Sequence, residues 1–122
     1  MPIDRVVVAL QFSAVVNMTA AELRAWLKTD ASRRVGWKGA DGQRRESVGH
    51  ASGRAIAHIL SKTPGELTDA DFAHMRKTVG FVRRHRAQEP ANMVTSRWRY
   101  SLMNWGHDPL KSAKATPGSV AR

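Results

Sequence analysis

The strongest helix signal in the chain is DADFAHMRKTVGFVRRHRAQ, residues 69–88. Apolar side chains recur in it at the spacing of one helix face, i, i+3, i+7 and i+10: Phe72, Met75, Val79 and Val82. Thr68 stands at the N-cap position, and Asp71 stands where a carboxylate completes a capping box. Pro90 disfavours helical backbone at Glu89 and so ends the helix. The pattern predicts a long helix with one buried face.

An adjoining face of this predicted helix is cationic. At about 100° per residue it gathers four side chains around Gly80, here called the helix cations: Arg76, Lys77, Arg83 and Arg84. No carboxylate lies among these four to neutralise them. Such a face can be an ordinary solvated surface, as most charge runs are. The missing acidic partners favour instead a face that lies against a phosphate backbone, with Gly80 allowing close approach.

Periodicity and capping signals predict further helices over residues 3–16, 19–30, 47–61 and 95–106. Thr19 and Glu22 form a second capping box, and Gly106 is a natural C-terminal stop. The β-branched run at residues 6–8 would equally suit a strand. A turn is expected at residues 63–66.

These elements predict an all-α fold, a compact bundle of about five helices with a long basic loop over residues 32–45. Residues 1–110 are expected to form a single helical domain, and residues 111–122 have the composition of a disordered basic tail. Gly49 and Gly53 weaken the helix at residues 47–61 by up to about 1 kcal/mol each relative to Ala. We expect them to admit a tightly packed neighbouring helix rather than to contact phosphate.

The charge balance is strongly basic. Among 122 residues, 20 Lys and Arg face 10 Asp and Glu, a formal net charge of +10. The excess is concentrated in residues 31–62 and 91–122. Such a field attracts polyanions, although a merely soluble basic protein would share this composition. The chain has no cysteine, which excludes disulfides and thiolate chemistry and fits the cytoplasm. Its apolar runs are far too short to cross a bilayer, so no membrane role is expected.

The predicted loop supplies a second group of candidate binding residues. Five basic side chains, here called the loop cations, lie in it: Arg33, Arg34, Lys38, Arg44 and Arg45. Trp37 lies among them and can either stack on a base or fold back over the core. Tyr100, flanked by arginines, is the second candidate for stacking.

The segment RWRYSLMNWGHDPL, residues 97–110, is unusually dense in aromatic and charged residues. Trp98, Leu102 and Trp105 share one helix face and are expected in the core, as is Trp26. The remaining candidates for contacts from this segment are polar: Arg97, Arg99, Tyr100, Asn104 and His107.

Catalysis and metal binding find little support in the sequence. No nucleophile motif, phosphate-binding loop or metal-ligand spacing is present, so no catalytic residue, metal or cofactor is predicted. One enzyme hypothesis remains. It places His50, His107 and Asp108 together in a pocket beneath the final helix, and the sequence disfavours it.

Several segments carry a family resemblance: residues 17–19, 22–23, 26–27, 32, 35–37, 46–50, 52–54, 67–68, 74–77, 83–88 and above all 97–110, with the signature WRYSLMNWGHDPL at 98–110. Together they resemble a family of small, mostly bacterial proteins classed as a domain of unknown function and often labelled DNA-binding. The resemblance spans residues 17–110. It implies a compact helical domain and DNA binding, and it supplies no catalytic residues.

The combined expectation is a small basic protein that binds nucleic acid, with DNA as the expected target, mainly through the phosphate backbone. The helix cations would form one wall of the site and the loop cations the other. One alternative is a protein-interaction module for an acidic partner protein. The other is the histidine-based enzyme.

Overall fold

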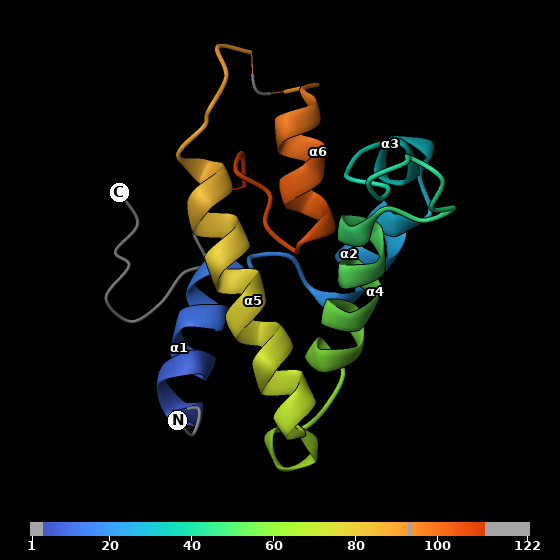
Figure 1. Ribbon diagram of the computed structural model, residues 1–122. Helices are drawn as coiled ribbons and strands as arrows, with labels where there is room; N and C mark the ends of the chain where they lie inside the picture. The colour runs from blue at the N-terminus through green and yellow to red at the C-terminus, as the bar shows by residue number, and fades with distance from the viewer. Residues whose placement is uncertain (1–3, 93, 112–122) are drawn as a thin grey trace.

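Six α-helices and one 3₁₀ turn follow one another in a computed structural model that describes residues 4–92 and 94–111 (Figure 1). They are α1 (Arg5–Val15), α2 (Ala20–Leu27), α3 (Asp30–Arg34), α4 (Val48–Leu60), the turn η1 (Pro64–Glu66), α5 (Asp69–Arg86) and α6 (Arg97–Asn104). No strand occurs in the described ranges. The predicted all-α fold is therefore confirmed, and the β-branched run at residues 6–8 lies in a helix. The tail predicted over residues 111–122 lies, from residue 112 on, outside the described residues.

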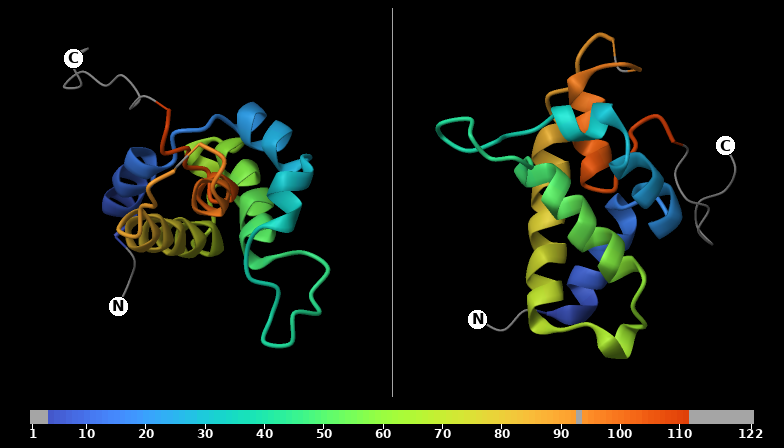
Figure 2. Two further views of the ribbon diagram at one scale, coloured as in Figure 1. Left: turned by 90° about the horizontal axis from the view of Figure 1, so that it is seen from above. Right: turned by 90° about the vertical axis from the view of Figure 1, so that its right-hand side faces the viewer.

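The short helix α6 lies at the centre of the bundle. It packs against α2, α3, α4 and α5, while α1 packs along α5 and α2 along α4. Viewed from above, the other helices surround α6, and the loop between α3 and α4 projects away from them (Figure 2). Residues 97–104 thus form the centre of the fold, around which the remaining helices are arranged.

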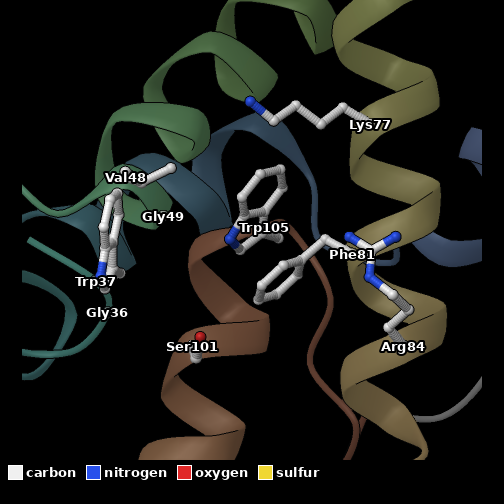
Figure 3. A pocket seen from close by; sticks show the side chains of 9 residues that line it. All are labelled: Gly36, Trp37, Val48, Gly49, Lys77, Phe81, Arg84, Ser101 and Trp105. Atoms are coloured by element: carbon white, nitrogen blue, oxygen red, sulfur yellow. The ribbon is translucent and has the colours of Figure 1, made fainter. Parts of the chain in front are cut away.

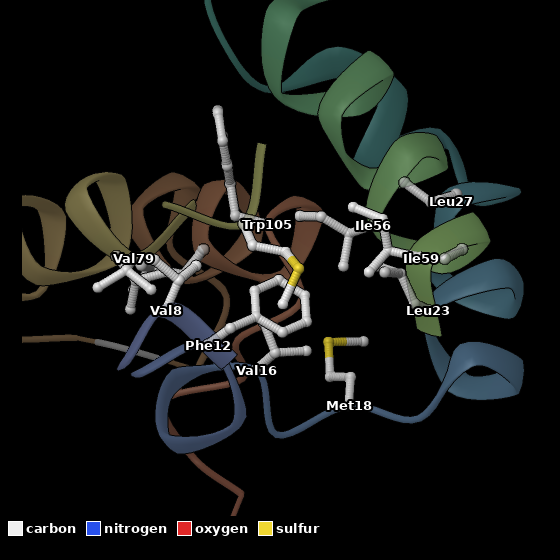
Figure 4. Close-up of a cluster of buried hydrophobic side chains, with 14 of the residues drawn as sticks. Val8, Phe12, Val16, Met18, Leu23, Leu27, Ile56, Ile59, Val79 and Trp105 are labelled. Carbon is white, nitrogen blue, oxygen red and sulfur yellow. The ribbon is translucent and has the colours of Figure 1, made fainter. Parts of the chain in front are cut away.

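The core confirms the predicted faces (Figure 4). All four apolar residues of the α5 stripe are buried, as are Trp98, Leu102 and Trp105 on α6, whereas Trp26 is only partly buried. Leu23, Ile56 and Leu102 are completely buried. The predicted caps are also present. Thr68 and Asp71 form a capping box at the start of α5, and Thr19 forms one with Glu22.

One boundary differs from the prediction. The helix expected over residues 19–30 ends at Leu27, and a further short helix, α3, begins at Asp30 and extends into the expected loop. The reason is a second capping residue, because the Thr29 hydroxyl accepts a hydrogen bond from the amide of Ser32 at 3.1 Å. The loop without helix is therefore shorter, and Arg33 and Arg34 lie on α3.

Gly49 and Gly53 admit α6, as predicted. A Cβ atom at Gly53 would lie 2.5 Å from the carbonyl oxygen of Asn104, and one at Gly49 would lie 3.1 Å from Trp105 Nε1. Any side chain at Gly53 would therefore push α4 and α6 apart.

A set of hydrogen bonds joins the end of α6 to the segment between α1 and α2. Gly106 adopts a φ of +81° and makes a Schellman ending, in which the amide of His107 donates to the carbonyl of Leu102 at 3.0 Å. The carbonyl of Gly106 accepts from the amides of Asn17 and Met18. The Asn17 amide group in turn donates to the carbonyl of Asp108 and accepts from its N–H. Much of the segment 97–110 therefore serves to close the fold.

Across the described residues, no single helix is both long and apolar enough to cross a membrane, while α1 and α2 taken together pass the same test of length and composition but are bent by 61°.

Candidate functional site

Three adjoining hollows on one side of the bundle all include Lys77, and together they are called the Lys77 groove here. The first has a volume of about 220 Å³ and contains Trp37, Phe81, Arg84 and Trp105 beside Lys77 (Figure 3). The second adds Arg76 and Gly80. The third adds Arg44, Ser52 and His74. The groove thus combines cations from α5 and from the loop with aromatic residues that come from three different elements.

Helix α5 presents its cations to the groove because the adjoining apolar face is fixed in the core. The buried stripe from Phe72 to Val82 sets the rotation of the helix, which leaves Arg76, Lys77 and Arg84 exposed. The Arg84 guanidinium lies over Gly80, where a Cβ atom would come within 3.0 Å of its Nη1. Gly80 therefore makes room for an arginine side chain of the same face.

The opposite side of the groove is built by the loop between α3 and α4. Gly36 and Gly39 adopt φ values of +106° and +94°, which side chains rarely tolerate. The carbonyl of Trp37, between them, accepts a hydrogen bond from the amide of Val48 at 2.9 Å. These constraints hold the Trp37 indole across the hollow from Lys77 and Arg84, with 64% of the residue exposed (Figure 3).

The floor of the groove is part of an aromatic stack. Five rings follow one another with centroids 4.4 to 6.4 Å apart and planes inclined by 7 to 18°: His74, Trp105, Phe81, His85 and Trp98. His74 is fixed by a 2.8 Å hydrogen bond between its Nε2 and Ser52 Oγ. From the sequence, Trp105 was predicted only as a core residue, and Phe81 was not predicted as a site residue. Its position four residues after Lys77 and three before Arg84 would have placed it on the same side of the helix.

The positive charges of the Lys77 groove have no carboxylate partner among the described residues. In the described part of the chain, five of the ten carboxylates pair with Lys or Arg residues outside the two predicted groups: Asp69 with Arg5, Glu46 with Arg54, Asp71 with Lys62, Asp108 with Arg99 and Glu22 with Lys111. None of the four helix cations or the five loop cations takes part in an ion pair among these residues. All nine residues predicted to bind therefore keep their positive charge without an acidic partner, as do Arg24, Lys28, Arg86 and Arg97 among the described residues.

A second, separate hollow contains Arg33 and Arg45 together with Glu46 and His50. The His50 Nδ1 lies 2.5 Å from a Glu46 oxygen, and its Nε2 lies 2.8 Å from the carbonyl oxygen of Leu27. Each ring nitrogen of His50 therefore faces an acceptor oxygen, one of a carboxylate and one of a backbone carbonyl. Hydrogen bonds from Arg54 hold the pKa of Glu46 down to about 2. This cluster is a closed ionic contact, and His50 has no free nitrogen for catalysis.

The predicted binding residues divide into three groups. Arg44, Arg76, Lys77, Arg84 and Trp37 meet in the Lys77 groove. Arg33 and Arg45 lie in the second hollow, while Arg34, Lys38 and Arg83 line none of the four hollows described above.

The polar candidates from residues 97–110 are mostly engaged elsewhere. Tyr100 packs on Trp26, with ring centroids 5.3 Å apart, and is not part of the groove. The expectation of surface contacts from Asn104 is wrong, because Asn104 is fully buried. Arg99 is held by both carboxylate oxygens of Asp108.

Among the described residues, no hydrogen bond joins His50 to His107 or Asp108, the other residues of the enzyme hypothesis. His50 contacts Glu46 and Leu27, whereas His107 Nδ1 lies 2.6 Å from the carbonyl oxygen of Val15, and Asp108 binds Arg99. Within residues 4–92 and 94–111, no group of three or more His, Asp or Glu side chains could hold a metal ion.

Stability should fall as the pH decreases from 7 to 5. Burial lowers the pKa of His74, His85 and His107, and His85 Nε2 has no hydrogen-bond partner among the described residues. Below a pH of about 6.5 the unfolded chain takes up protons that the folded chain excludes, so the free energy of unfolding decreases. Urea unfolding at several pH values measures this slope. The variant His85→Phe should reduce this slope, whereas a pH-independent stability would contradict the prediction.

Comparison with known proteins gives one match. The model of a protein family described as "Protein of unknown function (DUF3140)" matches residues 11–103. No curated protein and no solved structure matches the chain.

Proposed function

The chain belongs to this family of proteins of unknown function (DUF3140), and from the Lys77 groove we propose that it binds nucleic acid, with DNA as the expected target, mainly through the phosphate backbone. The observation that carries the proposal is the division of charge. Carboxylates pair with cations elsewhere, while Lys77, Arg84 and Arg44 stay unpaired around one groove among the described residues. Unpaired cations on one face are the usual electrostatic footprint of phosphate binding.

The exposed positions of these cations suit a polyanion better than a small ligand. Arg76, Lys77 and Arg84 lie along about two turns of α5, and Arg44 comes from the opposite side. A phosphate chain presents charges at regular intervals and can contact all of them, whereas a small anion contacts one or two.

Neutralising the two groove cations nearest the aromatic floor tests the proposal. The double variant Lys77→Ala with Arg84→Ala should weaken binding of a short duplex by roughly 10- to 100-fold at low salt, because each lost cation removes a charged contact. The slope of log affinity against log salt concentration should fall by about 2, one for each lost phosphate contact. Fluorescence polarisation at two or more salt concentrations measures both quantities.

A matched control removes the same charge from Arg24 of α2 and from Lys28, the C-cap residue of that helix. Arg24 and Lys28 are exposed and line none of the hollows described above, so Arg24→Ala with Lys28→Ala should change the affinity much less. Absence of binding at low salt by the unmodified protein, or equal losses in both double variants, would refute the proposed interface.

A further inference from the structure

The first hollow of the Lys77 groove differs from the rest of the groove in being mostly apolar. Its floor consists of Phe81 and Trp105, with Trp37 on the loop side and Ser101 of α6 at one end (Figure 3). Phosphate contacts alone need cations and polar donors and no aromatic floor. The hollow therefore has a feature that backbone binding leaves unexplained.

The size of the hollow limits what can enter it. Its volume of about 220 Å³ is below the range of roughly 300 to 1,000 Å³ found for sites of drug-sized ligands. A single planar ring system fits this space, whereas an intact double helix is too wide to reach the floor.

Trp37 is available to such a ring. It is 64% exposed, and in the described part of the chain its indole stacks on no other ring, unlike Trp105 and Phe81, whose centroids are 4.4 Å apart. The backbone of Trp37 is anchored through its hydrogen bond from Val48. Exposed indoles on fixed backbone are typical stacking platforms for bases.

The cations of the same hollow indicate that its ligand carries negative charge. Lys77 and Arg84 lie seven residues apart on α5, which is about 10 Å along the helix axis. Neither has a carboxylate partner among the described residues. A ring held between Trp37 and the floor and linked to negative groups on both sides would satisfy this arrangement.

From these observations we infer that the hollow bounded by Trp37, Phe81 and Trp105 receives one unpaired nucleobase, whose flanking phosphates contact Lys77 and Arg84. The faces of a paired base are covered by its neighbours, so only a base in a single strand or one turned out of the duplex can enter. The chain therefore prefers single-stranded or locally opened nucleic acid. This inference rests on the proposed nucleic-acid binding and specifies its substrate class.

Three labelled ligands of equal length, about 12 nucleotides, separate the inference from the proposed function. They are a thymidine strand, an abasic strand with the same phosphates and no bases, and a fully paired duplex. The unmodified protein should bind the thymidine strand roughly 5- to 100-fold more tightly than the abasic strand, which corresponds to stacking of one base. Binding of all three with equal affinity would overturn the inference and leave the proposed function standing. Binding of none at low salt would refute both.

The variant Trp37→Ala should abolish the preference for the thymidine strand and leave binding of the abasic strand almost unchanged. Trp37→Phe should retain part of the preference, and Leu10→Ala, which removes an exposed apolar side chain of α1, should retain all of it. Ser101→Leu, which fills the hollow from α6 without changing charge, should act like Trp37→Ala. An unchanged preference in both Trp37→Ala and Ser101→Leu, with circular dichroism showing folded proteins, would overturn the inference.

Discussion

Replacing Gly53 with alanine is expected to destabilise the fold by about 2 to 4 kcal/mol, more than most single methyl additions. The added Cβ would lie 2.5 Å from the carbonyl oxygen of Asn104 and 2.7 Å from a methyl carbon of Leu27. The carbonyl is backbone and cannot move without shifting α6, which packs against four other helices. The higher helix propensity of alanine, up to about 1 kcal/mol, offsets only part of this cost. Chemical denaturation followed by circular dichroism measures the difference.

Gly80→Ala is the matched control for this prediction. Gly80 also lies inside a helix, but the nearest atom to an added Cβ is Nη1 of Arg84 at 3.0 Å, the end of a flexible side chain that can move aside. The alanine should therefore stabilise the protein by up to about 1 kcal/mol through helix propensity. If Gly53→Ala were as well tolerated as Gly80→Ala, the close approach of α4 and α6 would be wrong.

Local signals in the sequence were sufficient for most of the helices. The stripe of α5 and the caps at Thr19 and Thr68 depend on residues three to four apart, which a sequence displays directly. Helix α3 was missed because its N-cap, Thr29, lay within the helix predicted over residues 19–30, and the residues after it were assigned to the glycine-rich loop at 32–45. The central position of α6 could not be predicted, since it depends on contacts with four helices.

The candidate site was predictable only in part. Charge counting identified the helix cations and the loop cations, but only the folded chain brings Arg44 and Lys77 into one hollow and moves Arg33 and Arg45 into another. The aromatic floor was harder to foresee. A tryptophan in a core pattern, such as Trp105, can still line a hollow when its neighbour on the next helix is a glycine, here Gly49.

Asn104→Ala is expected to be the most damaging polar substitution, with a loss of about 3 to 5 kcal/mol. The fully buried Asn104 Oδ1 accepts hydrogen bonds from Trp26 Nε1 at 2.8 Å and from Ser32 Oγ, and its Nδ2 donates to the carbonyl of Ser32 at 3.0 Å. Truncation leaves two buried groups of Ser32 on α3 without these partners, each at a cost of about 1 to 3 kcal/mol, and it also removes the acceptor of the partly buried Trp26 Nε1 on α2.

A series of variants distinguishes this network from simple loss of volume. Trp26→Phe removes one donor and leaves Asn104 two partners, so it should cost less than half as much as Asn104→Ala. Asn104→Asp keeps the size but places a carboxylate opposite the Ser32 carbonyl, so it should be as harmful as alanine. If Asn104→Asp were tolerated, cavity formation rather than hydrogen bonding would account for the alanine result.

The same network should also affect binding, because Asn104 directly precedes Trp105 in the chain. Variants that loosen this network should lose the base preference of the Lys77 groove before they lose its phosphate contacts, since only the former depends on the aromatic floor.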